Sequence, residues 1–155
     1  MEVRPRVAPN LLLFIMSLKS EIFRRILPYT TEGNVRVIRP NLRDYPGSSR
    51  FSPEELARFR SEDPVEQTAA IRDFGLSVIA FLDYLITTYA IPPGSMKDGK
   101  KCGGIAVVSW SYANILSLSI LAHAGSIFAA TQYDLTKYIR TFVLYGERDQ
   151  CYHLQ

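Results

Sequence analysis

Ser111 is the residue of this chain that is best placed to act as a nucleophile. It lies within residues 103–119, GGIAVVSWSYANILSLS, which begin as a buried strand and break into a helix. A serine hydroxyl attacks a carbonyl only after a base removes its proton. The backbone N–H of Tyr112, in the first turn of the predicted helix, could donate to the resulting oxyanion. These residues indicate acyl transfer; the alternative is an ordinary serine in a strand-to-helix turn.

The spacing of the two histidines does not identify a base for Ser111. His123 falls in the same predicted helix, about 18 Å from Ser111 along the helix axis, so we predict that it packs between helices. His153 reaches Ser111 only if the end of the chain folds back. Trp110 adjoins the serine and either lines a pocket or packs in the core. Ser109 is interpreted as a small residue of the turn, not as a second nucleophile.

The elements that must position Ser111 alternate between strands and helices. Strands are predicted at residues 10–16, 35–38, 104–109 and 138–145, and helices at residues 20–27, 53–60, from 63 to before Pro92, and 112–124. Ser52 and Glu55 form a capping-box signature. Pro28 and Gly125 are predicted to end helices, and residues 95–101 to form a polar loop.

This alternation predicts an α/β fold with a mostly parallel sheet and helices on both faces. In such sheets, sites form at the carboxyl ends of the strands. The loop after Ile38 and the turn at Ser111 both follow strands of this kind. We therefore expect these two segments to meet at one edge of the sheet.

The composition fits one globular domain. The 155 residues are 47% hydrophobic and 21% charged, and a net charge of +3 is too small to predict nucleic-acid binding. Cys102 and Cys151 form no disulfide framework, and no metal site is predicted. We expect a cytoplasmic protein. Two alternatives stay open. The protein could be secreted, because the first residues faintly resemble a signal peptide. It could also span a membrane, because the uncharged residues 102–133 are long enough to cross a bilayer.

The turn at Ser111 resembles the nucleophile elbow of the α/β-hydrolase family. That elbow has the pattern G-x-S-x-G between a strand and a helix. The corresponding residues are Ser109-Trp110-Ser111-Tyr112-Ala113, with small residues at both glycine positions. Small residues are needed there because the helix and the strand crowd together.

Two further segments are similar to the same family. Residues 41–49, NLRDYPGSS, resemble its D-x-R-G-x-G-x-S segment, and the matching residues are Arg43, Gly47 and Ser49. Asn41 stands in place of the aspartate, and Asp44 in place of the first glycine. Residues 143–149, VLYGERD, resemble the stretch that ends in the catalytic acid.

The chain also departs from the family pattern. The first strand is not followed by the His-Gly dipeptide that shapes the family's oxyanion hole. Family members normally continue through further strands to a catalytic histidine. We therefore expect residues 1–155 to form a single, incomplete α/β-hydrolase-like domain.

The resemblance implies roles for three residues and a reaction. Ser111 is the nucleophile, the backbone N–H of Tyr112 is an oxyanion donor, and Asp149 is a tentative acid. A solvated carboxylate beside Arg148 is the alternative for Asp149. The implied reaction is hydrolysis of a small ester or acyl substrate through an acyl-enzyme, with no cofactor and no metal. A serine at this position disfavours epoxide and haloalkane hydrolases, which use an aspartate.

Other functions stay open beside the hydrolase. The chain could be an inactive or truncated remnant that binds a small apolar molecule or a partner protein. A membrane-associated protein is the less expected third reading. A sheet without later strands would expose the apolar strand predicted at residues 138–145, YIRTFVLY, and such an edge predicts self-association.

Overall fold

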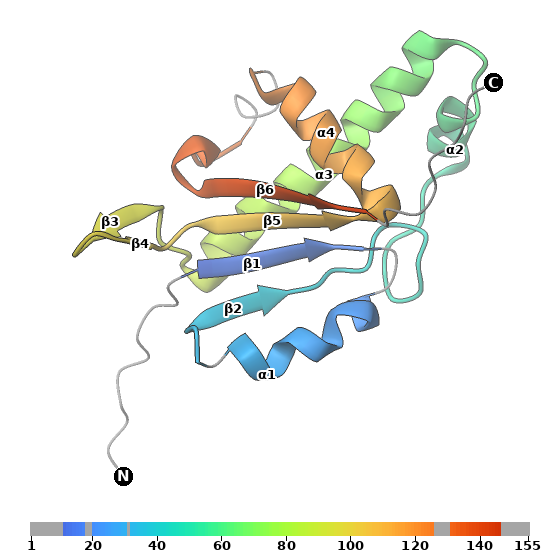
Figure 1. The fold of residues 1–155 in the computed structure, drawn as a ribbon. Coiled ribbons are helices and arrows are strands. Elements are labelled where there is room, and N and C mark those ends of the chain that lie inside the picture. Colours follow the sequence, from blue (N-terminus) through green and yellow to red (C-terminus); the bar gives the residue numbers. More distant parts are fainter. Residues whose placement is uncertain (1–10, 18–19, 31, 126–130, 147–155) are drawn as a thin grey trace, which may run out of the picture.

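The computed structural model describes residues 11–17, 20–30, 32–125 and 131–146. Among these residues, four parallel strands form one sheet in the order β2-β1-β5-β6 (Figure 1). The strands are β1 (Leu11–Met16), β2 (Val35–Ile38), β5 (Ile105–Trp110) and β6 (Ile139–Tyr145). The prediction of an α/β fold with a mostly parallel sheet is confirmed.

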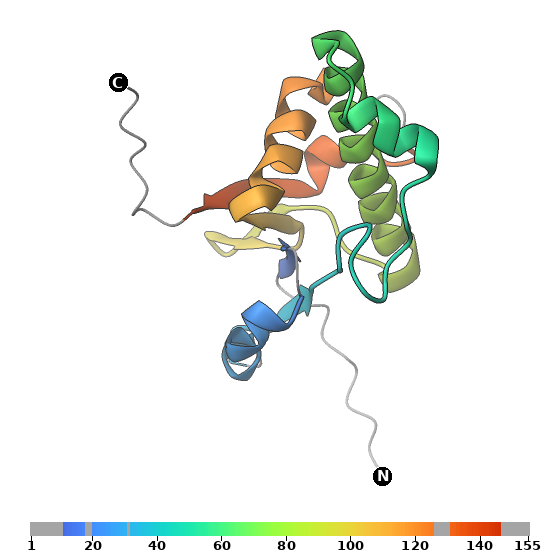
Figure 2. The ribbon, with the colours of Figure 1, turned by 90° about the vertical axis from the view of Figure 1, so that its right-hand side faces the viewer.

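Helices lie on both faces of this sheet (Figure 2). The 3-10 helix η1 (Ser20–Ile26) and the short α1 (Leu27–Thr30) join β1 to β2 on one face. The long α3 (Pro64–Tyr89) and α4 (Asn114–Ala122) cover the other face. β1 leads to β2 on one side and β5 leads to β6 on the other, so right-handed crossovers require their helices on opposite faces. The strand order therefore reverses between β1 and β5.

The hydrophobic core lies between the sheet and α3. Alternate residues of β1 point toward this helix, and Ile105 and Val107 of β5 continue the same layer. These buried core residues include Leu12, Phe14, Met16, Ile79, Leu82 and Leu116. Central parallel strands are covered on both faces, which explains why β1 reads as a continuous apolar run. Within the described ranges, no helix has both the length and the apolar character that a membrane span requires.

The two helices before β5 both begin at a capping side chain, and the capping box predicted for Ser52 and Glu55 is confirmed. Ser52 Oγ accepts from the backbone N–H of Glu55, and the Glu55 carboxylate accepts from the backbone N–H of Ser52, so the capping box of α2 (Pro53–Phe59) is complete. Asp63 caps α3 by accepting from the N–H of Val65.

Three local predictions are wrong. Pro28 does not end a helix; it lies at the start of α1, where proline has no hydrogen bond to lose. Gly125 does not close α4, which ends at Ala122 with His123 as its C-cap. The predicted polar loop at 95–101 is a hairpin of β3 (Ser95–Lys97) and β4 (Lys100–Cys102).

Candidate active site

Ser111 has a backbone conformation that the surrounding structure must impose. It follows β5 directly, begins the 3-10 turn η2 (Ser111–Ala113) that leads into α4, and has φ +55°. Of the five described non-glycine residues with positive φ, three are Asn or Asp, which tolerate this region, and Ala90 ends α3. Ser111 is neither an Asn or Asp nor the last residue of a helix, so neither reason explains its positive φ. A residue held in this region costs about 1–3 kcal/mol, and such residues cluster at functional sites.

The residues two positions before and after Ser111 are fully buried. Ser109 and Ala113 are small, as the close approach of β5 to the following helix demands. Ser109 Oγ donates to Asn114 Oδ1 at 2.8 Å, and Asn114 Nδ2 donates to the carbonyl oxygen of Tyr145 at 3.1 Å. This chain of bonds ties β5, α4 and β6 together around the turn. The hydroxyl of Ser109 thus has a structural hydrogen bond, which fits its interpretation as a small residue of the turn.

Ser111 and Tyr112 themselves lie at the surface. Tyr112 is in the first turn of the helical segment, where backbone N–H groups have no partner within the helix. Donors of this kind can stabilise an oxyanion. Among the described residues, no imidazole or carboxylate hydrogen-bonds to Ser111.

The loop after β2 lies beside the carboxyl ends of the strands, as expected. Ser17, directly after β1, forms a parallel bridge with Asn41. Arg43 fixes the loop to α2, because its guanidinium donates two bonds to the Glu55 carboxylate, at 2.6 and 2.8 Å. The same group lies 4.3 Å from the centre of the Phe51 ring. Arg43 therefore holds the loop in place through contacts within the protein.

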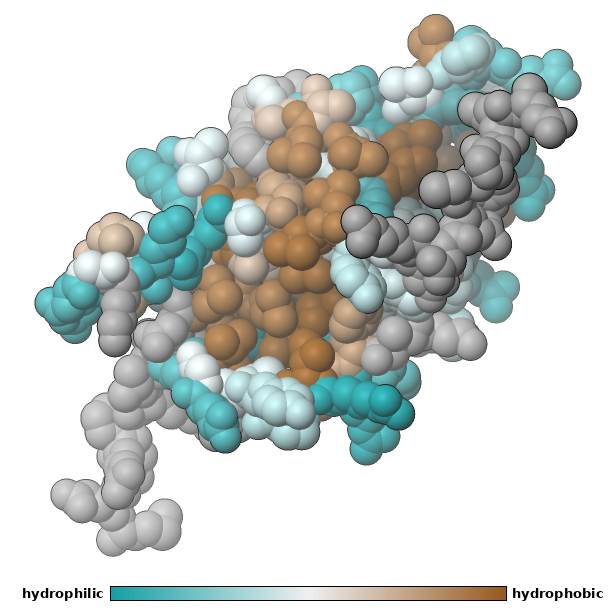
Figure 3. Space-filling view, viewed as in Figure 1, coloured by the Kyte–Doolittle hydropathy of each residue, from teal (hydrophilic) through white to brown (hydrophobic). Residues whose placement is uncertain are grey.

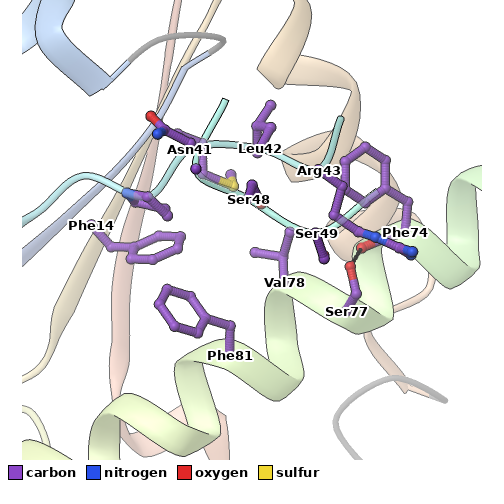
Figure 4. Close-up of a pocket in the computed structure, with 13 residues that line it drawn as sticks. Phe14, Asn41, Leu42, Arg43, Ser48, Ser49, Phe74, Ser77, Val78 and Phe81 are labelled. Atoms are coloured by element: carbon purple, nitrogen blue, oxygen red, sulfur yellow. Dashed lines mark hydrogen bonds between the residues drawn. The ribbon is translucent and has the colours of Figure 1, made fainter. Parts of the chain in front are cut away.

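Two cavities flank the Leu42–Arg43 segment of this loop. The first, of about 410 Å³, lies between the loop and α3. Figure 4 shows Phe14, Val78 and Phe81 on its inner side, with Ser48 and Ser49 on the loop side. The hydroxyl of Ser77 in its wall donates to the Phe74 carbonyl oxygen at 2.7 Å.

The second cavity, of about 420 Å³, extends toward the turn at Ser111. Tyr112 and Ile115 line it on one side, and Tyr45 and Phe51 of the loop line it on another. Its wall is rich in aromatic and aliphatic side chains, with Asp44, Arg43 and Gln67 as polar members. A cavity of this size suits a small molecule with an apolar part.

The other predicted site residues lie apart from Ser111 or outside the description. His123 caps the C-terminal end of α4, whereas Ser111 precedes its N-terminal end. Trp110 packs edge-on against Phe23 of η1, with ring centres 5.9 Å apart, and lines neither cavity. Asp149 and His153 lie outside the described residues. The described part of the chain holds no group of three or more metal-ligating side chains.

Sequence reasoning named polar members of the cavity walls, such as Arg43 and Ser49, but missed the apolar residues that form most of the walls. Tyr45 and Phe51 were the available signal, because they are large aromatic residues in an otherwise polar loop. Leu42 contributes to both cavities and belongs to the buried core, which its position in a polar loop did not indicate.

No family model, curated protein or solved structure matches this chain.

Proposed function

We propose that this chain is an α/β-hydrolase-like protein that hydrolyses a small ester or acyl substrate with Ser111 as nucleophile. The observation that carries the proposal is the positive φ of Ser111 on a strand-to-helix turn. The turn lies at the carboxyl end of β5, beside the point where the strand order reverses. Open parallel sheets bind ligands at this point. The buried Ser109 and Ala113 support the same interpretation.

The proposed reaction has two steps. Ser111 Oγ bonds to the carbonyl carbon of the substrate and gives its proton to a base, while the backbone N–H of Tyr112 donates to the oxyanion. The bond from carbon to the alcohol oxygen then breaks, and the alcohol leaves with a proton. Water attacks the acyl-enzyme, which releases the acid and returns the proton to Ser111. Asp149 is the proposed acid.

The second cavity is the proposed substrate pocket. Tyr112 lines it, and Tyr112 adjoins the nucleophile. Its wall consists mainly of apolar side chains, so the substrate should carry an apolar acyl or alcohol group. We propose a cytoplasmic location, because two cysteines do not make the disulfide framework of a small secreted domain.

A non-catalytic binding protein is the competing proposal. It is favoured by the first cavity, whose inner wall holds Phe14, Val78 and Phe81 and which, unlike the second, is not lined by Tyr112. Such a protein would hold a small apolar molecule under the loop and would keep the elbow without turnover.

A fluorophosphonate probe separates the two proposals, because it phosphonylates only an activated serine. We expect labelling of the wild type and of Ser95→Ala, an exposed serine of β3, and at least a tenfold loss in Ser111→Ala. Circular dichroism would establish that each variant is folded. A folded but unlabelled wild type would contradict turnover and favour the binding protein.

A further inference from the structure

We propose that two copies of this chain associate through their β6 strands to form one continuous sheet. β6 is the last strand of the described sheet and pairs only with β5 there. Within the described part of the chain, the backbone groups on its outer side therefore have no strand partner. The opposite edge differs: β2 has four half-buried residues, and its Arg36 lies over the Tyr89 ring, 5.4 Å from its centre.

The side chains of β6 favour association rather than resist it. Val143, Leu144 and Tyr145 are 45%, 42% and 58% exposed. Thr141 to Tyr145 contain no charge and no proline, the usual features that protect an edge. The one charged residue of the strand, Arg140, donates to the Gly103 carbonyl oxygen at 2.9 Å and lies near the start of the strand.

Helix α4 extends this apolar surface beside the strand. Asn114, Leu118 and Leu121 are spaced so that they share one side of the helix. Asn114 donates to the Tyr145 carbonyl oxygen, so this side faces β6. Leu118 and Leu121 are 54% and 47% exposed. They are thus apolar side chains without a covering layer among the described residues.

The two elements contribute to one broad surface. In Figure 3 the hydrophobic colour runs from α4 across β6 toward the inner strands of the sheet. Leu144 shares its face of the sheet with Ser109 and lies on the α4 side, while Val143 and Tyr145 lie on the other face with Val108 and Trp110. A partner must therefore contact both faces as well as the edge, which a strand with its own flanking helix can do.

A second copy fits these requirements. Antiparallel pairing of β6 with itself around a two-fold axis perpendicular to the sheet makes each copy fill the edge of the other. This axis keeps α4 and its counterpart on the same face, so Leu118 and Leu121 approach the same residues of the partner. Centred on Val143, the pairing places Thr141 opposite Tyr145, and no two like charges oppose each other within residues 140–146.

Analytical ultracentrifugation over a range of concentrations tests the proposal. We expect a reversible dimer of the full chain, and at least a tenfold higher dissociation constant for Val143→Lys and for Leu118→Lys. In an isologous interface each substitution acts twice. Tyr29→Lys, an equally drastic change at an exposed residue of α1, should leave the constant unchanged.

Covalent trapping gives a second measurement that does not depend on a destabilising variant. In a chain with Cys102→Ser and Cys151→Ser, Val143→Cys should form a disulfide-linked dimer on mild oxidation, because opposed residues of antiparallel strands lie about 4.5–5.5 Å apart. Tyr29→Cys should not. A monomer at all concentrations, open-ended aggregates, or a dimer that both lysine variants leave intact would overturn the proposal.

Discussion

At the scale of single residues, the backbone conformation of Ser111 should lower the free energy of unfolding. Its positive φ is easy for glycine and strained for serine and alanine. We therefore expect Ser111→Gly to raise the free energy of unfolding by about 1 kcal/mol relative to Ser111→Ala. Urea denaturation of both variants measures this difference. The comparison does not depend on catalysis, so it tests the elbow geometry separately from turnover.

Ser49 provides the matched control for this experiment. It is an exposed loop serine whose φ is not positive. There, glycine should be no more stable than alanine, because glycine has more conformational freedom to lose. If glycine stabilised both positions equally, the gain at Ser111 could not be attributed to its backbone conformation.

The sequence identified Ser111 and its small neighbours but not the partners of Trp110. The position of Ser111 follows from a change of pattern within a few residues, and the size limit on Ser109 and Ala113 follows from local crowding. The sequence did not decide whether Trp110 lines a pocket or packs in the core, because its neighbour, Phe23, lies 87 residues earlier and on another element. A contact of this range has no local signal in one sequence.

At the scale of elements, Glu55 connects the loop to α2 and should make this connection sensitive to acid. The hydrogen bond from Arg43 is the main reason that the pKa of Glu55 lies below its usual 4.5, followed by the bond from the Ser52 backbone. A lowered pKa means that the stabilisation is fully present above about pH 4.5 and is lost as the pH falls through the folded value. Glu55→Gln should therefore be less stable than wild type at pH 7, and the difference should shrink toward pH 3.

Urea unfolding of the two proteins between pH 3 and pH 7 measures this effect. Glu62→Gln is the control, because Glu62 is an exposed glutamate just beyond α2. Its difference from wild type should stay small throughout. A difference between wild type and Glu55→Gln that stays constant with pH would contradict the assigned ion pair.

The elements themselves were largely predictable, and the exceptions have physical causes. Continuous apolar runs indicate the buried strands, and helical periodicity indicates the long helices. The capping residues Ser52 and Asp63 bond only to neighbours within three positions. The hairpin at 95–102 was missed because most of its residues are polar and because residues 95–99 and Lys101 are exposed, which hides the strand signal. The available clue was the dipeptide Asp98-Gly99, which is typical of a two-residue hairpin turn. Both residues have the positive φ that such a turn demands.

At the scale of the whole molecule, the sequence pattern did not predict the order of the strands in the sheet. Alternating strands and helices predict a parallel sheet, but β2-β1-β5-β6 depends on pairings between residues that are far apart in the chain. The strand order reverses between β1 and β5. It therefore determines that the loop after β2 lies near the turn at Ser111. The two cavities depend on the same packing.

The two faces of the sheet should contribute unequally to stability, because α3 and α4 cover one face and η1 with α1 covers part of the other. Leu82 is fully buried under the sheet, and Leu82→Ala should lower the free energy of unfolding by about 3 kcal/mol. Phe23 is half-buried on η1, so Phe23→Ala should cost only about 1 kcal/mol.

Trp110 reports on the thinner side directly, because it is the only tryptophan in the chain and packs against Phe23. Phe23→Ala should shift its emission to longer wavelength in the folded protein, whereas Leu82→Ala should leave the emission in place and move only the unfolding midpoint. Fluorescence spectra and urea denaturation followed by circular dichroism measure the two effects. Equal losses of stability, or an unshifted emission in Phe23→Ala, would show that η1 is not a thin cover over Trp110 but a full part of the cooperative core.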